Sequence, residues 1–157
     1  MPHRYVPNCL AYTGTHDNDT TYGWFHTSQV TTTQPRAEVA AARAFALRYA
    51  HTTADEIHWG LIRAVFASVA DTAIVPMQDI LGLDSRARMN FPGKAEGNWR
   101  WRYRKEQVDR EVRDRLADLT AAYSRWNGAV PAQWDPRYRP LPQKDEGFGE
   151  RLKPSEG

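Results

Sequence analysis

The sequence predicts an α/β fold built from two consecutive strand–helix units, and three features of its 157 residues support this class. Two short apolar segments have the composition of buried strands. Each is followed by a polar loop, and amphipathic helix patterns lie between and after them. Because both loops then lie at the carboxyl ends of parallel strands, this order predicts the functional side of an α/β barrel or an open sheet.

The first predicted strand is NCLAYT, residues 8–13, which is apolar, partly β-forming and ended by Gly14. The stretch that overlaps it, YTGTHDNDTTYGWF at residues 12–25, concentrates His16, Asp17, Asp19 and several threonines. Taken alone, such a run more often forms a hydrogen-bonded turn than a catalytic site, because Asp and Asn side chains cap turns and helices.

Two helices are predicted between the strands. The first begins near Pro35, since proline suits the first turn of a helix, and an apolar face recurs at Val39, Ala42, Ala46 and Tyr49. The second follows Thr53 and Glu56, which have the spacing of a capping box, and ends near Asp71. Its apolar positions recur every fourth residue at Ile57, Leu61, Val65 and Val69.

The second predicted strand is TAIVPM, residues 72–77, which is apolar at both alternating sets of positions. That pattern predicts a strand covered on both faces, and Pro76 limits it to about five residues because proline cannot donate to a ladder. Residues 78–104 are polar and irregular, and they include three glycines, Asn90, Trp99 and Trp101. We interpret this stretch as a second functional loop.

The last helix is predicted at residues 105–126, with one apolar stripe at Val108, Val112, Leu116, Leu119 and Tyr123. Half of the ten prolines follow in residues 127–157, together with Lys, Asp, Glu and Gly. We therefore expect a structured part at residues 1–126 and a loosely ordered tail at residues 127–157.

Composition excludes several classes of function. A net charge of +2, from 21 basic and 19 acidic side chains, gives no strong signal for binding nucleic acid or anionic lipid. The single cysteine, Cys9, permits no internal disulfide and fits a reducing compartment. No apolar run has the length of a signal peptide or a membrane span, so a cytoplasmic location without membrane contact is expected.

Two strands cannot close a barrel, and an isolated two-stranded sheet leaves edges uncovered, so the chain is predicted to be part of a larger fold. Three segments resemble, in order, the carboxyl-terminal motifs of the 4-α-glucanotransferase family, also called amylomaltases or disproportionating enzymes. They are YTGTHDNDTTYGWF, IRAVFASVADTAIVPMQDILGLDSRARMNFPG and GNWRWR, and the resemblance runs from about Asn8 to Trp126.

The resemblance implies a TIM (β/α)8 barrel, of which this chain holds the last two β/α units. It also implies a retaining transfer of α-1,4-glucan segments between maltooligosaccharides, with no metal and no organic cofactor. Asp17 would hydrogen-bond sugar hydroxyls and favour the oxocarbenium-like transition state, and His16 would donate to a neighbouring hydroxyl. Asn90 would line the glucan cleft. Gln78, Asp79, Trp99 and Trp101 would lie in the cleft or in its supporting shell.

The remaining candidates keep two interpretations each. Asp19 fits a sugar contact or loop scaffolding, and Trp99 fits stacking on a sugar or filling of the core. A metal site from His16, Asp17, Asp19 and His26 is conceivable, but these residues lack a recognised ligand spacing.

A retaining glycosidase needs a carboxylate nucleophile and a carboxylic acid/base about 5 Å apart. In the family both come from earlier strands, and Asp71, Asp79 and Asp84 match no nucleophile motif. We therefore expect this chain to be inactive alone and to need the amino-terminal part of the barrel as a partner. The alternative is a non-catalytic remnant that at most binds glucan or a partner chain.

Overall fold

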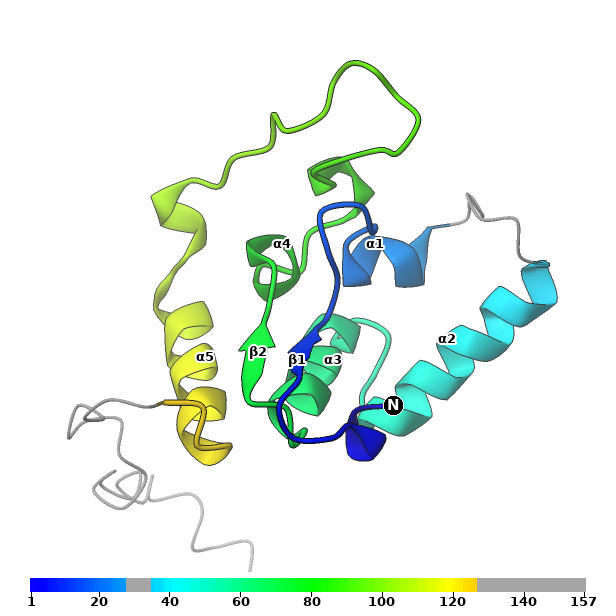
Figure 1. Cartoon of the computed structure of the whole chain (residues 1–157). Coiled ribbons are helices and arrows are strands. Elements are labelled where there is room, and N and C mark those ends of the chain that lie inside the picture. Colours follow the sequence, from blue (N-terminus) through cyan, green and yellow to red (C-terminus); the bar gives the residue numbers. More distant parts are fainter. Residues whose placement is uncertain (28–34, 127–157) are drawn as a thin grey trace, which may run out of the picture.

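The computed structural model describes residues 1–27 and 35–126, so the predicted tail at residues 127–157 lies outside the described residues. A two-stranded parallel sheet stands at the centre, with helices around it (Figure 1). The strands are β1 (Leu10–Tyr12) and β2 (Thr72–Ile74), with Ala11 opposite Ala73. The predicted α/β class and the parallel pairing are confirmed, although both strands are shorter than their apolar segments.

The helices follow a simple order along the chain. The α-helices are α1 (Thr21–His26), α2 (Arg36–Ala50), α3 (Ile57–Phe66), α4 (Met77–Ile80) and α5 (Arg110–Ala122). Short 3-10 helices lie at η1 (Pro2–Arg4), η2 (Ser85–Ala87) and η3 (Lys105–Gln107). The two polar loops and the short helices α1 and α4 gather beyond the carboxyl ends of β1 and β2, as the predicted order requires (Figure 1).

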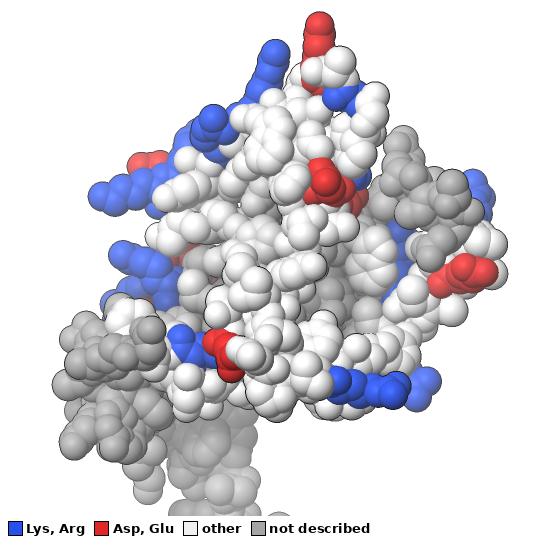
Figure 2. All heavy atoms as spheres, in the orientation of Figure 1, with Lys and Arg blue, Asp and Glu red and all other residues white. Residues whose placement is uncertain are grey.

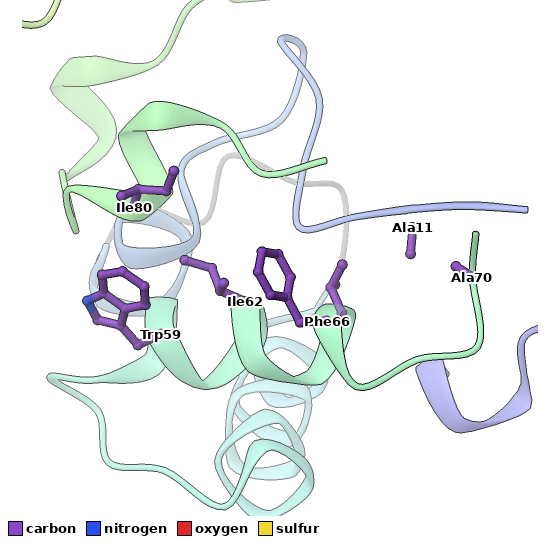
Figure 3. Packing of buried hydrophobic residues seen from close by; sticks show 7 residues of the cluster. Ala11, Trp59, Ile62, Phe66, Ala70 and Ile80 are labelled. Atoms are coloured by element: carbon purple, nitrogen blue, oxygen red, sulfur yellow. The ribbon is translucent and has the colours of Figure 1, made fainter. Parts of the chain in front are cut away.

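Helix α3 forms the centre of the hydrophobic core. Ile57 and Ile62 on this helix are completely buried. Ile62 and Phe66 belong to one cluster with Ala11 of β1 and with Ile80 of α4 (Figure 3). Four residues of the predicted stripe on α5 pack against this cluster, namely Val112, Leu116, Leu119 and Tyr123. Helix α3 therefore joins the sheet, α4 and α5 into one packed unit.

The opposite face of the sheet is uncovered in the part of the chain that the structure describes. Leu10 is 61% exposed, and Tyr12 and Ile74 are each 51% exposed. The expectation that β2 is covered on both faces is therefore wrong for the described residues, because α3 covers only the side of Ala11 and Ala73. An apolar surface is left beside the polar loops.

The ends of two helices differ from the predicted positions. Helix α3 ends at Phe66, before the expected Asp71, and Val69 beyond it is 55% exposed. Helix α5 begins at Arg110 because the Asp109 carboxylate caps it by accepting from the Val112 amide at 2.9 Å.

The predicted apolar face of α2 is only partly correct. Val39 and Ala46 are buried, but Ala42 is exposed. Arg43 lies toward the molecule instead, and its guanidinium donates to the carbonyl oxygens of Trp24 at 2.7 Å and Thr27 at 2.8 Å. Because alanines occur on most sides of this helix, the spacing of apolar residues does not identify its inward face. Arg43 thus fastens α2 to the end of α1.

The expected capping box at Thr53 and Glu56 is absent. Glu56 is itself the N-cap residue of α3 and makes no side-chain cap. Its carboxylate pairs instead with the guanidinium of Arg115 on α5, which also lies over the Trp59 ring at 4.5 Å. This hydrogen bond lowers the pKa of Glu56. The pair ties α5 to the start of α3.

His58 is buried between helices and lacks a full set of partners. It is 8% exposed, and its Nδ1 atom has no hydrogen-bond partner among the described residues. Gly82 has a φ of +60°, and a Cβ there would come within 2.8 Å of His58 Nε2. Burial lowers the pKa of His58, with smaller opposing effects from Glu56 and Asp79 and reinforcing effects from Arg115 and His26.

We expect the free energy of unfolding to fall as the pH drops below about 6.5, the ordinary pKa of histidine. Below this pH His58 binds a proton in the unfolded chain more readily than in the folded chain. The contribution of neutral His58 to stability is therefore complete above the unfolded pKa, and it is lost as the pH falls through the lower folded pKa. One such proton gives a slope of at most about 1.4 kcal/mol per pH unit. Urea unfolding between pH 5 and pH 8 measures it.

Two variants test the assignment of this slope. His58→Gln removes the titrating group and should flatten the slope. The control His51→Asn changes an exposed histidine with a left-handed φ of +47°, a conformation that asparagine tolerates, and should keep the slope. An unchanged slope in His58→Gln would contradict the prediction.

Candidate functional site

The two polar loops meet beyond the carboxyl ends of the strands. The amide of Asn90 donates to the carbonyl oxygen of His16 at 3.1 Å. Within the second loop, the amide of Trp99 donates to the carbonyl oxygen of Met89 at 2.8 Å, and Trp99 adopts a left-handed φ of +62°. The Trp99 ring lies 5.0 Å from the His16 ring. Residues far apart in the sequence therefore share one small region.

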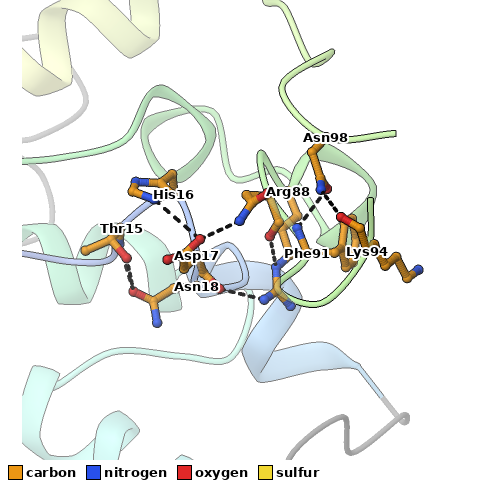
Figure 4. A network of polar contacts seen from close by, with 9 residues as sticks. Thr15, His16, Asp17, Asn18, Arg88, Phe91, Lys94 and Asn98 are labelled. Carbon is orange, nitrogen blue, oxygen red and sulfur yellow. Dashed lines mark hydrogen bonds and ion pairs between the residues drawn. The ribbon is translucent and has the colours of Figure 1, made fainter. Parts of the chain in front are cut away.

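Asp17 lies at the centre of these contacts (Figure 4). Its Oδ1 atom accepts a hydrogen bond from Asn90 Nδ2 at 2.6 Å and lies 3.4 Å from His16 Nε2. The side chain is 51% exposed, and its Oδ2 atom has no hydrogen-bond partner within residues 1–27 and 35–126. An ionised carboxylate with a free oxygen can accept hydrogen bonds from hydroxyl groups.

A cavity of about 440 Å³ lies beside this cluster. Its apolar wall is formed by the open face of the sheet, with Leu10, Tyr12 and Ile74. His16, Asp19 and Trp99 line it from the loops. Its volume lies within the range typical of small-molecule sites, and Trp99 is 55% exposed, so this ring does not fill the core. Asp17 and Asn90 lie next to the cavity and are not part of its lining.

Asp19 is held by the protein itself. Its Oδ1 atom accepts from the amide of Thr20 at 2.8 Å, and its Oδ2 atom accepts from Ser85 Oγ at 2.7 Å. Helix α1 packs closely on η2 at Gly23. A Cβ atom at this position would lie only 2.6 Å from the Ser85 amide nitrogen, so the contact needs a glycine. Of its two interpretations, these contacts favour scaffolding, although Asp19 also borders the cavity.

Asp79 is a buried anchor beneath the loops. It is 2% exposed, and its carboxylate accepts from Thr13 Oγ1 at 2.5 Å, from the Thr21 amide at 2.8 Å and from Thr21 Oγ1 at 3.0 Å. These bonds join the end of β1, the start of α1 and helix α4. The sequence alone did not separate Asp79 from a cleft residue, and its geometry is that of support. Gln78 is also buried, and both residues border the cavity.

Replacing Asp79 by asparagine should destabilise the fold by about 2–3 kcal/mol, because the half-buried Thr13 and the buried Thr21 lose a charged acceptor. The matched control is Asp84→Asn in the same loop. The Asp84 side chain is 42% exposed, and it caps η2 by accepting from the Arg86 amide, which asparagine can also do. Urea unfolding monitored by tryptophan fluorescence compares the two variants. Equal stability losses would contradict the anchoring role.

The structure also describes the other candidate residues around the loops. Trp101 is half-buried. The Arg102 guanidinium donates to the carbonyl oxygens of Trp99 and Trp101, and these bonds hold this part of the second loop together. Within the described residues, no group of three His, Cys, Asp or Glu side chains is arranged to hold a metal ion. Two residues of the metal set considered from the sequence have other partners. Asp19 accepts from Ser85, and the His26 ring stacks on Tyr22 with centroids 4.1 Å apart.

Arg88 is the site residue that sequence reasoning missed. It lines the cavity, and its guanidinium contacts both polar loops. The only signal was its position two residues before Asn90 in an arginine-rich stretch.

Charged side chains and apolar helices are distributed as follows over the described part of the chain. Figure 2 shows Lys and Arg mainly along the margins of this face, while a small acidic patch lies near its upper centre. Among the helices that the structure describes, none is both long enough and apolar enough to cross a bilayer.

Comparison with known proteins agrees with the resemblance of the motifs. The family model described as 4-alpha-glucanotransferase matches residues 1–108. A 4-alpha-glucanotransferase of Synechocystis is 46% identical over 119 residues, which are 75% of this chain and 22% of that protein. A chloroplastic/amyloplastic 4-alpha-glucanotransferase of Arabidopsis thaliana is 42% identical over 130 residues, which are 80% of this chain and 21% of that protein.

A solved structure supports the same relationship. The amylomaltase from Streptococcus agalactiae in complex with acarbose superposes with a TM-score of 0.68 at 37% identity. The match covers 81% of this chain and 24% of that protein, so the chain spans about a quarter of the length of its relatives. From the match over residues 1–108 and these identities, the chain belongs to the 4-alpha-glucanotransferase family.

Proposed function

We propose that this chain forms the carboxyl-terminal part of a 4-α-glucanotransferase barrel, where it supplies the carboxylate of Asp17 to a retaining transfer of α-1,4-glucan segments. The observation that carries the proposal is the 2.6 Å bond from Asn90 Nδ2 to Asp17 Oδ1. It joins residues from two separate family motifs at one edge of a parallel sheet, where ligands of α/β folds bind.

The geometry fits distinct roles for the site residues. The free oxygen of Asp17 accepts hydrogen bonds from hydroxyls of the sugar that is cleaved, and these bonds strengthen as the ring becomes oxocarbenium-like. His16 donates to a neighbouring hydroxyl, and Asn90 orients the Asp17 carboxylate. Trp99 offers an exposed ring at the cavity for a sugar face. Asp19 holds the first loop and borders the substrate.

The open face of the sheet is the surface on which the rest of the catalytic domain packs. Leu10, Tyr12 and Ile74 present exposed apolar side chains there, and both strands have unpaired outer edges among the described residues. Further strands of a TIM barrel would pair with these edges and place their own side chains, with the nucleophile and the acid/base, across the cavity from this face. The partner of this chain is therefore the amino-terminal part of a family barrel.

The test is transfer activity with maltotriose, measured for the purified chain with and without an amino-terminal portion from a family member. Glucose and oligomers longer than maltotriose should form only when both parts are present. Because the related amylomaltase was solved with acarbose, acarbose is a suitable competitor in this assay. Glucan binding without transfer in the combined protein would favour the alternative, a non-catalytic remnant.

A further inference from the structure

Arg88 connects the loop that carries Asp17 to the loop that carries Asn90. Its Nη2 atom donates to the carbonyl oxygen of Asp17 at 2.6 Å, and its Nε atom donates to the carbonyl oxygen of Asn90 at 2.8 Å. The guanidinium carbon lies 4.8 Å from the centroid of the Phe91 ring. One planar group thus fixes two main-chain carbonyls and rests on an aromatic side chain (Figure 4).

Besides Arg88, the loop around Asp17 is held to the second loop by Asp19, whose carboxylate accepts from Ser85 Oγ at 2.7 Å. Asp17 and Asn18 are exposed, and the bonds of Asn18 Oδ1 return to Thr15 within the same turn. Across the loops, the Asn90 amide bonds His16 and the Asn90 side chain bonds Asp17. Both of these bonds can form only while the second loop lies close to the first loop. The Arg88 bond joins the main chain of Asp17 itself to the second loop and so helps to maintain that distance.

We propose that Arg88 is a positioning residue that holds the two site loops together and thereby fixes the orientation of the Asp17 carboxylate. Its guanidinium suits this task because the fork of N–H donors is rigid and always charged. Lysine, with a single ammonium, cannot reproduce two donors at a fixed angle. The proposal rests on the proposed function only for its effect on turnover, since the clamp itself is a property of this chain.

Amide hydrogen exchange in the purified 157-residue chain tests the clamp without any activity. In Arg88→Met, which keeps an unbranched side chain but removes both donors, exchange at Asn90 should accelerate about tenfold or more as the loops separate. Exchange at Thr21, whose amide is bonded to the buried Asp79, should not change. The matched control is Arg86→Met in the same loop, because the Arg86 side chain is 91% exposed and pairs only locally with Asp84.

Unchanged exchange at Asn90 in Arg88→Met would overturn the proposal. Equal acceleration at Asn90 and Thr21 would overturn it as well, since it would mean general loosening. Arg88→Lys should lie between the parent and Arg88→Met because it keeps at most one of the two bonds.

Turnover provides the second test, in the protein combined with an amino-terminal portion. Arg88→Met should lower kcat about tenfold with little change in KM, the pattern expected when a group that acts in the transition state is misplaced. In an Asp17→Asn background the same change should cost less than about twofold, because a positioning residue has nothing left to position. A full tenfold loss in that background would show that Arg88 does not act through Asp17.

These readouts separate the two proposals. If Asp17→Asn alone leaves turnover intact, the proposed function is wrong, and exchange at Asn90 decides the role of Arg88 by itself.

Discussion

Replacing Asp17 by asparagine is expected to lower kcat about a hundredfold or more, the scale for an interaction made chiefly in the transition state. The measurement uses maltotriose and this chain joined behind the amino-terminal portion of a family member. KM should change much less than kcat, because hydroxyl contacts that strengthen only as the ring distorts contribute little to ground-state binding. Asparagine keeps the size of the side chain and removes its charge.

The geometry explains why the charge matters. Oδ1 is engaged by Asn90, whereas Oδ2 has no partner among the described residues and remains for substrate. A neutral amide at this position offers a weaker acceptor to the hydroxyls. It also loses the charge-assisted bond from Asn90, since its own NH2 group can face that donor.

The control is Asp84→Asn, which removes a carboxylate from the second loop. Asp84 pairs with Arg86, a bond that lowers the pKa of Asp84, and it lies outside the cluster around Asp17. Its variant should retain turnover within about twofold, as expected for a surface ion pair. Full turnover in Asp17→Asn, or equal losses in both variants, would remove the role assigned to Asp17.

The fold was predictable where periodicity and chain order carried the information. NCLAYT and TAIVPM contain the two strands, and their parallel pairing follows from the helices between them. Helices α1 and α4 were missed because each is short. Helix α1 begins inside a polar segment, and α4 begins at Met77, the last residue of the apolar segment TAIVPM. The α1 cap was readable in retrospect, since Thr20 Oγ1 accepts from the Gly23 amide at 2.9 Å.

The site was predictable as a location more than as a set of contacts. Two loops after neighbouring parallel strands must meet, and Asp17 and Asn90 do meet although 73 residues separate them. The roles of Asp79 and Arg88 depend on bonds across 66 and 71 residues, and no periodicity encodes such pairs. The resemblance to the family selected Asp17 from several acidic residues, which the composition of THDND alone did not.

We expect the chain alone to show no measurable transglycosylation. A retaining transfer proceeds through a covalent glycosyl-enzyme, so it needs a nucleophile beneath the anomeric carbon and an acid/base about 5 Å away. Asp79 cannot serve, because it is buried and engaged by Thr13 and Thr21. Asp19 is engaged by Ser85 and Thr20, which leaves Asp17 as the one carboxylate of this cluster with a free oxygen among the described residues.

A single carboxylate can stabilise developing positive charge, but it cannot supply both covalent catalysis and proton transfer. Incubating the purified chain with maltotriose should therefore leave the sugar unchanged, while adding an amino-terminal family portion should produce glucose and longer oligomers. The matched control is the same mixture with Asp17→Asn, which should be at least about a hundredfold slower. Transfer by the chain alone would mean that the nucleophile lies within these 157 residues and that the catalytic carboxylates are misassigned.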